Sequence, residues 1–316
     1  MSFRAIEEEV KEEIRQGQKP LTLFMLGGVD VGKTFTVTSI ANWLYEQGLN
    51  VAVVDADVGQ SDIGPPCCIG MGILEKRIRK LSEVPLHSLY FAGNTSPNGC
   101  MRECVKGAAA AVKKAKELNA DVILVDSTGW IEGEDGLRFK MLEIKEIKPS
   151  FVVAIEKNSE LAHILPHLNK IFVVIRLRMS NEAISRTREE RKSLREEAYN
   201  KYFRAAKDRD FEFSILEWFP EEGRILGLFD RICEDKDKGE GEEILGLGIL
   251  KKRDYERGKV VVFTPVDAEG DITIKWIKPG GVKLISVNEG FKEFNSSQLR
   301  DWGMTHKCLL RGFKHR

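Results

Sequence analysis

Apolar residues recur along the first two thirds of the chain in two alternating patterns. Apolar positions three or four apart predict amphipathic helices, whereas short continuous runs of Val, Ile and Leu predict buried strands of a parallel sheet. The helical pattern covers residues 3–16, 36–45 and 101–118. The strand-like runs cover residues 21–26, 51–55, 89–93, 121–126, 151–155 and 171–175. This alternation predicts an α/β fold with a mostly parallel sheet.

From about residue 206 the pattern changes to short β-like runs separated by Gly and Asp. These runs cover residues 211–216, 224–229, 244–250, 259–264 and 271–276, and residues 234–243 read as a charged loop between two of them. The sequence therefore predicts a main domain at residues 1–205, a small C-terminal β domain at 206–290, and a tail at 291–316 for which no structure is predicted.

A phosphate-binding motif follows the first predicted strand. Residues 27–34 read Gly-Gly-Val-Asp-Val-Gly-Lys-Thr and match G-x-x-x-x-G-K-[ST] without a mismatch. Between a strand and a helix, such a P-loop surrounds phosphate oxygens with backbone N–H groups. Lys33 is expected to reach the β- and γ-phosphates of ATP, and the Thr34 hydroxyl to hold Mg²⁺ or another divalent cation. The predicted nucleotide-binding residues are Gly27, Gly28, Val29, Asp30, Val31, Gly32, Lys33, Thr34 and Phe35.

Acidic and polar residues follow the strands on either side of this loop. Asp55 ends one predicted strand, and Asp57 stands just beyond it. Ligands of open α/β sheets bind at the carboxyl ends of strands, so both carboxylates are expected beside the cation. One can act on the metal shell and the other can accept a proton from an attacking hydroxyl, with a turn-forming role for Asp57 as the alternative. Thr95 or Ser96 is a candidate for positioning the cation or the substrate, with a plain turn as the alternative.

Trp130 follows the predicted strand that ends at Asp126, a further acidic residue facing the site. An aromatic ring on such a loop can stack on a nucleic-acid base, which is worth roughly 1–3 kcal/mol, or it can pack locally. Both interpretations stay open from the sequence.

Residues 185–203 form the most charged segment of the chain. On a helix, Arg188, Arg191, Lys192 and Arg195 share one face, and neighbouring glutamates can neutralise them. This pattern is compatible with an exposed, salt-bridged helix. It is also compatible with a lid that donates arginines to the transferring phosphoryl group. Residues 71–88 are predicted to form a second basic helical segment.

Composition and charge narrow the class of protein. Lys+Arg and Asp+Glu both number 49, so the net charge is zero, and any polyanion site must be a local patch. The six Cys form no C-x-x-C pair, and His163 and His167, predicted on one helix, lack a third ligand. The sequence therefore predicts no zinc site and a reduced, cytoplasmic protein. No apolar run is long enough to span a membrane, and the charged N-terminus does not resemble a signal peptide.

Two other P-loop classes fit the sequence less well. A GTPase would carry N-K-x-D, but residues 169–172 lack the Asp. ATPases with a deviant P-loop carry a Lys where this chain has Leu26, although residues 53–60 resemble their second strand. That ATPase class therefore remains an alternative.

Several motifs occur together in one order. They are the P-loop with Asp30, Asp55-Ala-Asp-Val-Gly-Gln60 followed by Pro65-Pro66, Gly93-Asn-Thr-Ser-Pro97, Asp126-Ser-Thr-Gly-Trp-Ile-Glu-Gly133, and the arginine-rich segment leading to Tyr202-Phe203. This arrangement resembles the polynucleotide 5′-hydroxyl kinases related to the RNA kinase of the eukaryotic mRNA 3′-end cleavage factor and to the nucleolar kinase of pre-rRNA processing. The high charged fraction of 31% and the scarcity of Gln are typical of a heat-adapted source, so an archaeal member is expected.

The resemblance implies an ATP- and Mg²⁺-dependent kinase that phosphorylates the 5′-hydroxyl end of RNA, and it leaves DNA open as an acceptor. Asp57 matches the residue that activates the hydroxyl, and Trp130 matches the aromatic that stacks on the terminal nucleotide. Two alternatives stay open, an ATP-binding scaffold of an RNA-processing complex and the P-loop ATPase. The expected catalytic residues are Lys33, Asp57, Arg191 and Arg195; the expected metal ligands are Thr34, Asp55, Asp57 and Thr95; the expected nucleic-acid contacts are Gln60, Thr95 and Trp130.

Overall fold

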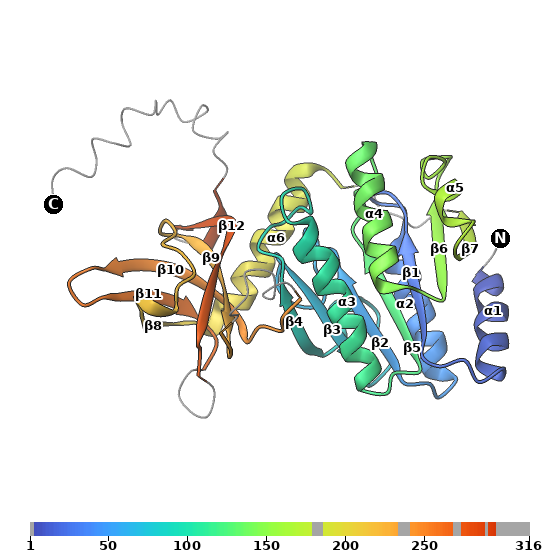
Figure 1. The fold of residues 1–316 in the computed structure, drawn as a ribbon, viewed down its shortest axis with the longest axis horizontal. Helices are drawn as coiled ribbons and strands as arrows, with labels where there is room; N and C mark the ends of the chain where they lie inside the picture. The colour runs from blue at the N-terminus through green and yellow to red at the C-terminus, as the bar shows by residue number, and fades with distance from the viewer. Residues whose placement is uncertain (1–2, 179–185, 233–240, 268–272, 288–289, 295–316) are drawn as a thin grey trace.

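A computed structural model describes residues 3–178, 186–232, 241–267, 273–287 and 290–294 (Figure 1). Its larger part is a seven-stranded sheet in the order β4-β3-β2-β5-β1-β6-β7. From β2 to β7 every neighbouring pair is parallel, whereas β3 is antiparallel to both β2 and β4. The strands are β1 (Leu21–Leu26), β2 (Val51–Ala56), β3 (Cys68–Ile73), β4 (Leu86–Phe91), β5 (Val122–Ser127), β6 (Phe151–Glu156) and β7 (Val173–Arg178).

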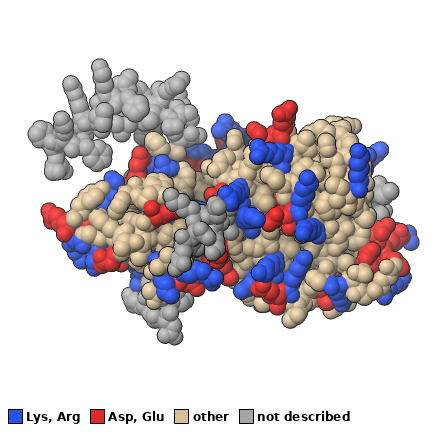
Figure 2. Space-filling model, viewed as in Figure 1, with Lys and Arg blue, Asp and Glu red and all other residues tan. Residues whose placement is uncertain are grey.

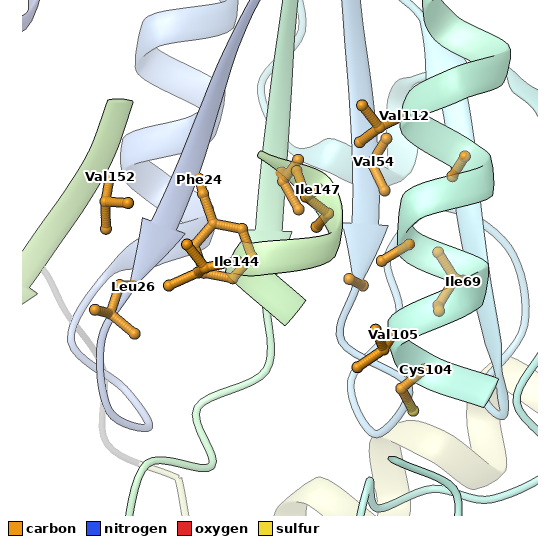
Figure 3. Packing of buried hydrophobic residues seen from close by; sticks show 14 of the residues in the cluster. Phe24, Leu26, Val54, Ile69, Cys104, Val105, Val112, Ile144, Ile147 and Val152 are labelled. Atoms are coloured by element: carbon orange, nitrogen blue, oxygen red, sulfur yellow. The ribbon is translucent and has the colours of Figure 1, made fainter. Parts of the chain in front are cut away.

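Helices cover both faces of this sheet, because its central strands are apolar on both sides. Alternate residues of β1 point to opposite faces. Phe24 packs in the same apolar cluster as helices α3 (Met101–Glu117) and α4 (Gly133–Ile147). Leu23 packs on the other face with α1 (Phe3–Arg15) and α2 (Lys33–Glu46). Figure 3 shows the first of these layers, in which Phe24 lies close to Ile144.

The C-terminal part is a six-stranded antiparallel sheet in the order β13-β12-β9-β10-β11-β8. Helix α6 (Arg188–Tyr202) runs between the two sheets (Figure 1). Apolar residues from α6 and both sheets, including Tyr199, Phe91 and Phe229, form one buried cluster, which joins the two parts. The strands are β8 (Lys207–Glu212), β9 (Arg224–Phe229), β10 (Gly246–Asp254), β11 (Lys259–Thr264), β12 (Trp276–Val287) and β13 (Gly290–Glu293). The predicted fold class, an α/β P-loop domain followed by a small β domain, is confirmed.

The predicted basic helix at residues 71–88 is wrong. Strand β3, an exposed loop, a 3₁₀ turn (Leu81–Glu83) and the start of β4 occupy this stretch. A Cβ on Gly70 would lie 1.7 Å from the carbonyl oxygen of Ile63, and one on Gly72 would lie 2.2 Å from that of Pro85. Glycine therefore permits a close backbone approach on this strand, and the basic side chains belong to the loop.

The predicted helix carrying both histidines is also wrong. Helix α5 (Leu165–Leu168) is a single turn and leaves His163 outside, where its Nε2 lies 2.8 Å from the carbonyl oxygen of Ile131. Helix α4, by contrast, was not expected from the sequence. The predicted strand at 271–276 begins only at Trp276, and residues 271–272, most of the charged loop at 234–243, and residues 295–316 of the tail lie outside the described residues.

Short 3₁₀ turns also follow α6 (Phe203–Ala205) and β8 (Phe213–Ile215). Within the described ranges, no helix combines the length and apolar character that a membrane span requires.

Candidate active site

The P-loop joins β1 to α2. Helix α2 begins at Lys33, and Gly32 before it has a left-handed φ of 88°, which glycine adopts without strain. A Cβ on Gly27 would lie 2.7 Å from the carbonyl oxygen of Ile155, so the loop packs directly against the end of β6. The Lys33 ammonium donates hydrogen bonds to the carbonyls of Gly28 (2.6 Å) and Gly27 (3.1 Å). These two hydrogen bonds hold the Lys33 ammonium against the first two residues of the P-loop.

Asp126 of β5 lies beside the start of α2. Its Oδ2 accepts a 2.6 Å hydrogen bond from the Thr34 hydroxyl, and its buried Oδ1 has no hydrogen-bond partner among the described residues. Burial raises the pKa of Asp126 to about 7, against the attraction of Lys33. Burial likewise lowers the pKa of Lys33, against the attraction of Asp126 and then Asp57. Bound phosphate would place negative charge beside Lys33, and a bound cation would place positive charge beside Asp126.

These groups fit Mg²⁺, although the sequence reasoning gave Asp126 no metal role. A hydroxyl and a buried, unpartnered carboxylate oxygen are ligands that this cation accepts. The described residues contain no cluster of three or more His, Cys, Asp or Glu side chains that could hold a metal. The sheet register is what places Asp126 at the site, because Asp126 of β5 pairs with Met25 of β1, two residues before the P-loop.

The Asp55 side chain accepts hydrogen bonds from the backbone of the loop after β2. Its Oδ1 accepts from the backbone N–H of Asp57 (3.1 Å), and its Oδ2 from those of Asp62 (2.6 Å) and Ile63 (2.9 Å). The side chain is buried and does not line the cavity described below. Burial, with the nearby charge of Asp126, raises the pKa of Asp55 well above its usual value. The structure therefore gives Asp55 a clear role in holding the loop.

Asp57 both forms a turn and faces the site. Its Oδ1 accepts from the backbone N–H groups of Gly59 (3.0 Å) and Gln60 (3.1 Å). A Cβ on Gly59 would lie 2.8 Å from the carbonyl oxygen of Thr95, so this loop packs against the one after β4. The turn-forming interpretation of Asp57 is thus confirmed, and the turn fixes the direction of a carboxylate that lines the cavity described below.

A single cavity of about 610 Å³ collects most of these side chains. Its walls are the P-loop, the loops after β2, β4 and β5, and the start of α6. Asp55, Trp130, Gly27, Gly28 and Val31 do not line it. The predicted site residues that line it are Val29, Asp30, Gly32, Lys33, Thr34, Phe35, Asp57, Gln60, Thr95, Arg191 and Arg195.

The start of helix α6, the predicted lid, contacts the P-loop. Arg191 forms a 2.5 Å ion pair with Asp30, and the backbone N–H of Arg186 donates to the same carboxylate at 3.0 Å. The Gln60 side chain donates to the carbonyl of Arg191 at 3.1 Å. Arg195, one turn further on, lines the same cavity. The segment is therefore more than an exposed, self-paired helix.

The two remaining candidates lie in different surroundings. Thr95 lines the cavity, and its backbone N–H donates to the Asn94 side chain at 2.9 Å. Trp130 is half-buried, and its ring centroid lies 5.7 Å from that of Phe139 on α4. The Trp130 ring thus packs locally against the core, and the residue as a whole is not fully buried.

A mostly parallel sheet, a P-loop between β1 and α2, and an arginine-bearing helix in contact with that loop define a P-loop nucleotide-binding protein. The family model described as "mRNA cleavage and polyadenylation factor CLP1 P-loop" matches residues 27–205. The chain belongs to this family, as the motifs of the sequence predicted.

Relatives of known name support the assignment. A polyribonucleotide 5′-hydroxyl-kinase of Methanocaldococcus jannaschii is 41% identical, over 86% of this chain and 89% of that protein. One from Pyrococcus abyssi is 31% identical, over 82% of this chain and 79% of that protein. The solved structure of a Clp1p–Pcf11p complex shares the fold with a TM-score of 0.68 at 13% identity, over 89% of this chain and 78% of the matched chain.

Proposed function

We propose that this protein transfers the γ-phosphoryl group of ATP to the 5′-hydroxyl end of RNA. The observation that carries this proposal is the cavity itself, which brings Lys33, Asp57 and the lid arginines together. Relatives at 41% and 31% identity bear the name polyribonucleotide 5′-hydroxyl-kinase, so RNA is the acceptor we propose. DNA with a free 5′-hydroxyl is the second acceptor to test.

The P-loop end binds the triphosphate of ATP. Backbone N–H groups of the loop and the Lys33 ammonium hold the β- and γ-phosphates. Thr34 and Asp126 would hold Mg²⁺, which, when bound, offsets the negative charge of the phosphates. Asp126 needs its ionised form for this role, and the nearby Lys33 ammonium favours that form.

Asp57 accepts the proton of the attacking hydroxyl. Two backbone N–H groups fix its Oδ1, which leaves Oδ2 as the oxygen to take the proton. A positioned base of this kind contributes about 10²–10⁴-fold in rate. Arg191 exchanges Asp30 for an oxygen of the transferred group, where charge-assisted hydrogen bonds are strong.

The acceptor strand lies along the side of the cavity lined by Gln60 and Thr95, with Trp130 beyond it as a stacking surface. Lys, Arg, Asp and Glu are interspersed on the face seen in Figure 2. A short single strand needs only a local groove, so the neutral net charge agrees with such a substrate. The four described cysteines are free and buried, which supports our proposal of a cytoplasmic protein.

The proposal is tested with γ-labelled ATP, Mg²⁺, and RNA and DNA oligonucleotides that carry 5′-hydroxyl ends. The parent protein and Lys33→Ala are compared. Label on the RNA with the parent alone supports the proposal, and the DNA lane ranks the second acceptor. Label released as free phosphate would instead support the ATPase. ATP binding without either product would support the scaffold.

A further inference from the structure

The lid helix is paired with the C-terminal β domain as well as with the P-loop. Glu293 of β13 accepts hydrogen bonds from Arg195 Nε (2.7 Å) at Oε1 and from Nη2 (2.9 Å) at Oε2. The two side chains are 17% and 13% exposed. A bidentate, largely buried pair fixes the orientation of a guanidinium far better than an exposed pair does.

The strand that carries Glu293 is fastened to α6 through its backbone. The N–H of Glu293 donates to the Glu196 side chain at 3.1 Å. The Asn200 side chain accepts from the N–H of Phe291 (2.7 Å) and donates to its carbonyl (3.2 Å). A Cβ on Gly290 would lie 2.3 Å from the Asn200 Oδ1, so glycine permits this approach. These contacts with Glu196 and Asn200, on successive turns of α6, hold the Glu293 strand against the lid helix.

Arg195 is the group through which this contact reaches the active site. It lines the cavity with Lys33 and Asp57, whereas Glu293 does not. Glu293 takes one N–H from Nε and one from Nη2 of the guanidinium, so both N–H groups of Nη1 and the second N–H of Nη2 remain to meet a phosphoryl oxygen. The ion pair thus fixes the direction of the donor that the chemistry would use.

We propose that Glu293 is a positioning residue for phosphoryl transfer, and that the C-terminal β domain acts in catalysis by orienting Arg195. This inference rests on the proposed kinase function. Glu293 does not line the cavity, so its effect passes through Arg195. Preorganised donors are effective because they pay no reorganisation cost at the moment of reaction.

The test is Glu293→Gln, assayed by label transfer to RNA. We expect kcat to fall about tenfold, since a small misplacement of a reacting group is costly. The KM values for ATP and RNA should change by less than about threefold. The double variant with Arg195→Ala should be no slower than Arg195→Ala alone, because both changes remove one function. Glu293→Asp, which keeps the carboxylate, should recover part of the rate.

The matched control is Glu221→Gln. Glu221 lies in the same domain, pairs with Lys283 at 3.0 Å, and does not line the cavity. Its transfer rate should equal that of the parent, and thermal unfolding of each variant checks that it folds.

Two results would overturn the inference while leaving the kinase intact. Glu293→Gln could transfer phosphate at the parental rate, or faster, which would mean that Glu293 restrains Arg195. The double variant could show the product of the two single losses, as a merely structural role predicts. A parent protein without any transfer would instead overturn the proposed function.

Discussion

The two ends of the cavity are held together by different forces. At the phosphate end, β1 and β5 pair in the buried sheet, and α2 packs on that sheet. These elements place Lys33, Thr34 and Asp126. At the lid end, Arg191 and Arg195 are held by ion pairs with Asp30 and Glu293, which lie 161 and 98 residues away in sequence.

Because of this difference, we expect substitutions at the two ends to affect ATP binding and phosphoryl transfer differently. The phosphate end is preformed, because moving its groups would disrupt the core of the sheet. The Arg191–Asp30 pair is partly exposed, at 27% and 18%, so exchanging it for a phosphate oxygen costs little. Changes at the phosphate end should therefore weaken ATP binding and transfer together, whereas changes at the lid end should reduce transfer alone.

The largest effect is expected from Lys33→Ala. It removes the ammonium that we propose meets the β- and γ-phosphates, so transfer should fall by about 10³-fold or more. ATP titration should show weakened binding as well. Lys19→Ala, which removes an exposed pair with Asp121, should leave both values unchanged. Parental transfer by Lys33→Ala would contradict the account.

Asp57→Asn should lower kcat by about 10²–10³-fold and leave ATP affinity unchanged, because a base is lost and no phosphate contact is. The pair Asp55 and Asp57 sharpens the comparison. Asp55→Asn would turn an amide N–H₂ toward backbone N–H donors, which costs about 1–3 kcal/mol of stability. Thermal unfolding and transfer assays separate the two. If Asp55→Asn is stable but inactive and Asp57→Asn is active, then Asp55 is the base and Asp57 holds the loop.

Arg191→Ala should lower kcat by about 10²-fold, with little change in the KM for ATP, because one charged donor to the transferring group is lost. Arg204→Ala, an exposed arginine just after α6, is the control and should be neutral. A rise in the KM for ATP without a fall in kcat would show that Arg191 binds nucleotide in the ground state.

The smallest effect is expected from Trp130→Ala. Loss of one base-stacking surface, roughly 1 kcal/mol, should raise the KM for RNA by about fivefold and leave ATP affinity unchanged. Phe139→Leu changes the ring against which Trp130 packs without removing Trp130, so it controls for local repacking. Equal KM values for Trp130→Ala and the parent would assign Trp130 to packing.

Much of the fold could be predicted because buried parallel strands read as continuous apolar runs. Helix α4 could not, since its buried face contains Lys140 and Glu143, which pair with one another at 2.9 Å. Charged residues on a buried face hide the helical period. Strand β3 was missed for a related reason, because Gly70 and Gly72 lower its strand propensity while permitting close packing.

Lys33 and Thr34 at the phosphate end could be predicted because they belong to one local motif. Lys33, Thr34 and Asp57 lie in the cavity as expected. The contact of Asp126 with Thr34 depends on sheet register, and that of Glu293 with Arg195 depends on docking of the second sheet. Such contacts join residues 92 and 98 positions apart, and a single sequence carries no local signal for them.

The most direct test of the central claim compares one RNA in two forms, with a 5′-hydroxyl end and with a 5′-phosphate end. The measurement is the amount of label transferred from γ-labelled ATP per RNA end at completion. The account predicts about one phosphate per 5′-hydroxyl end and none on the 5′-phosphate form. Equal ATP consumption with either RNA, or with no RNA, would contradict it.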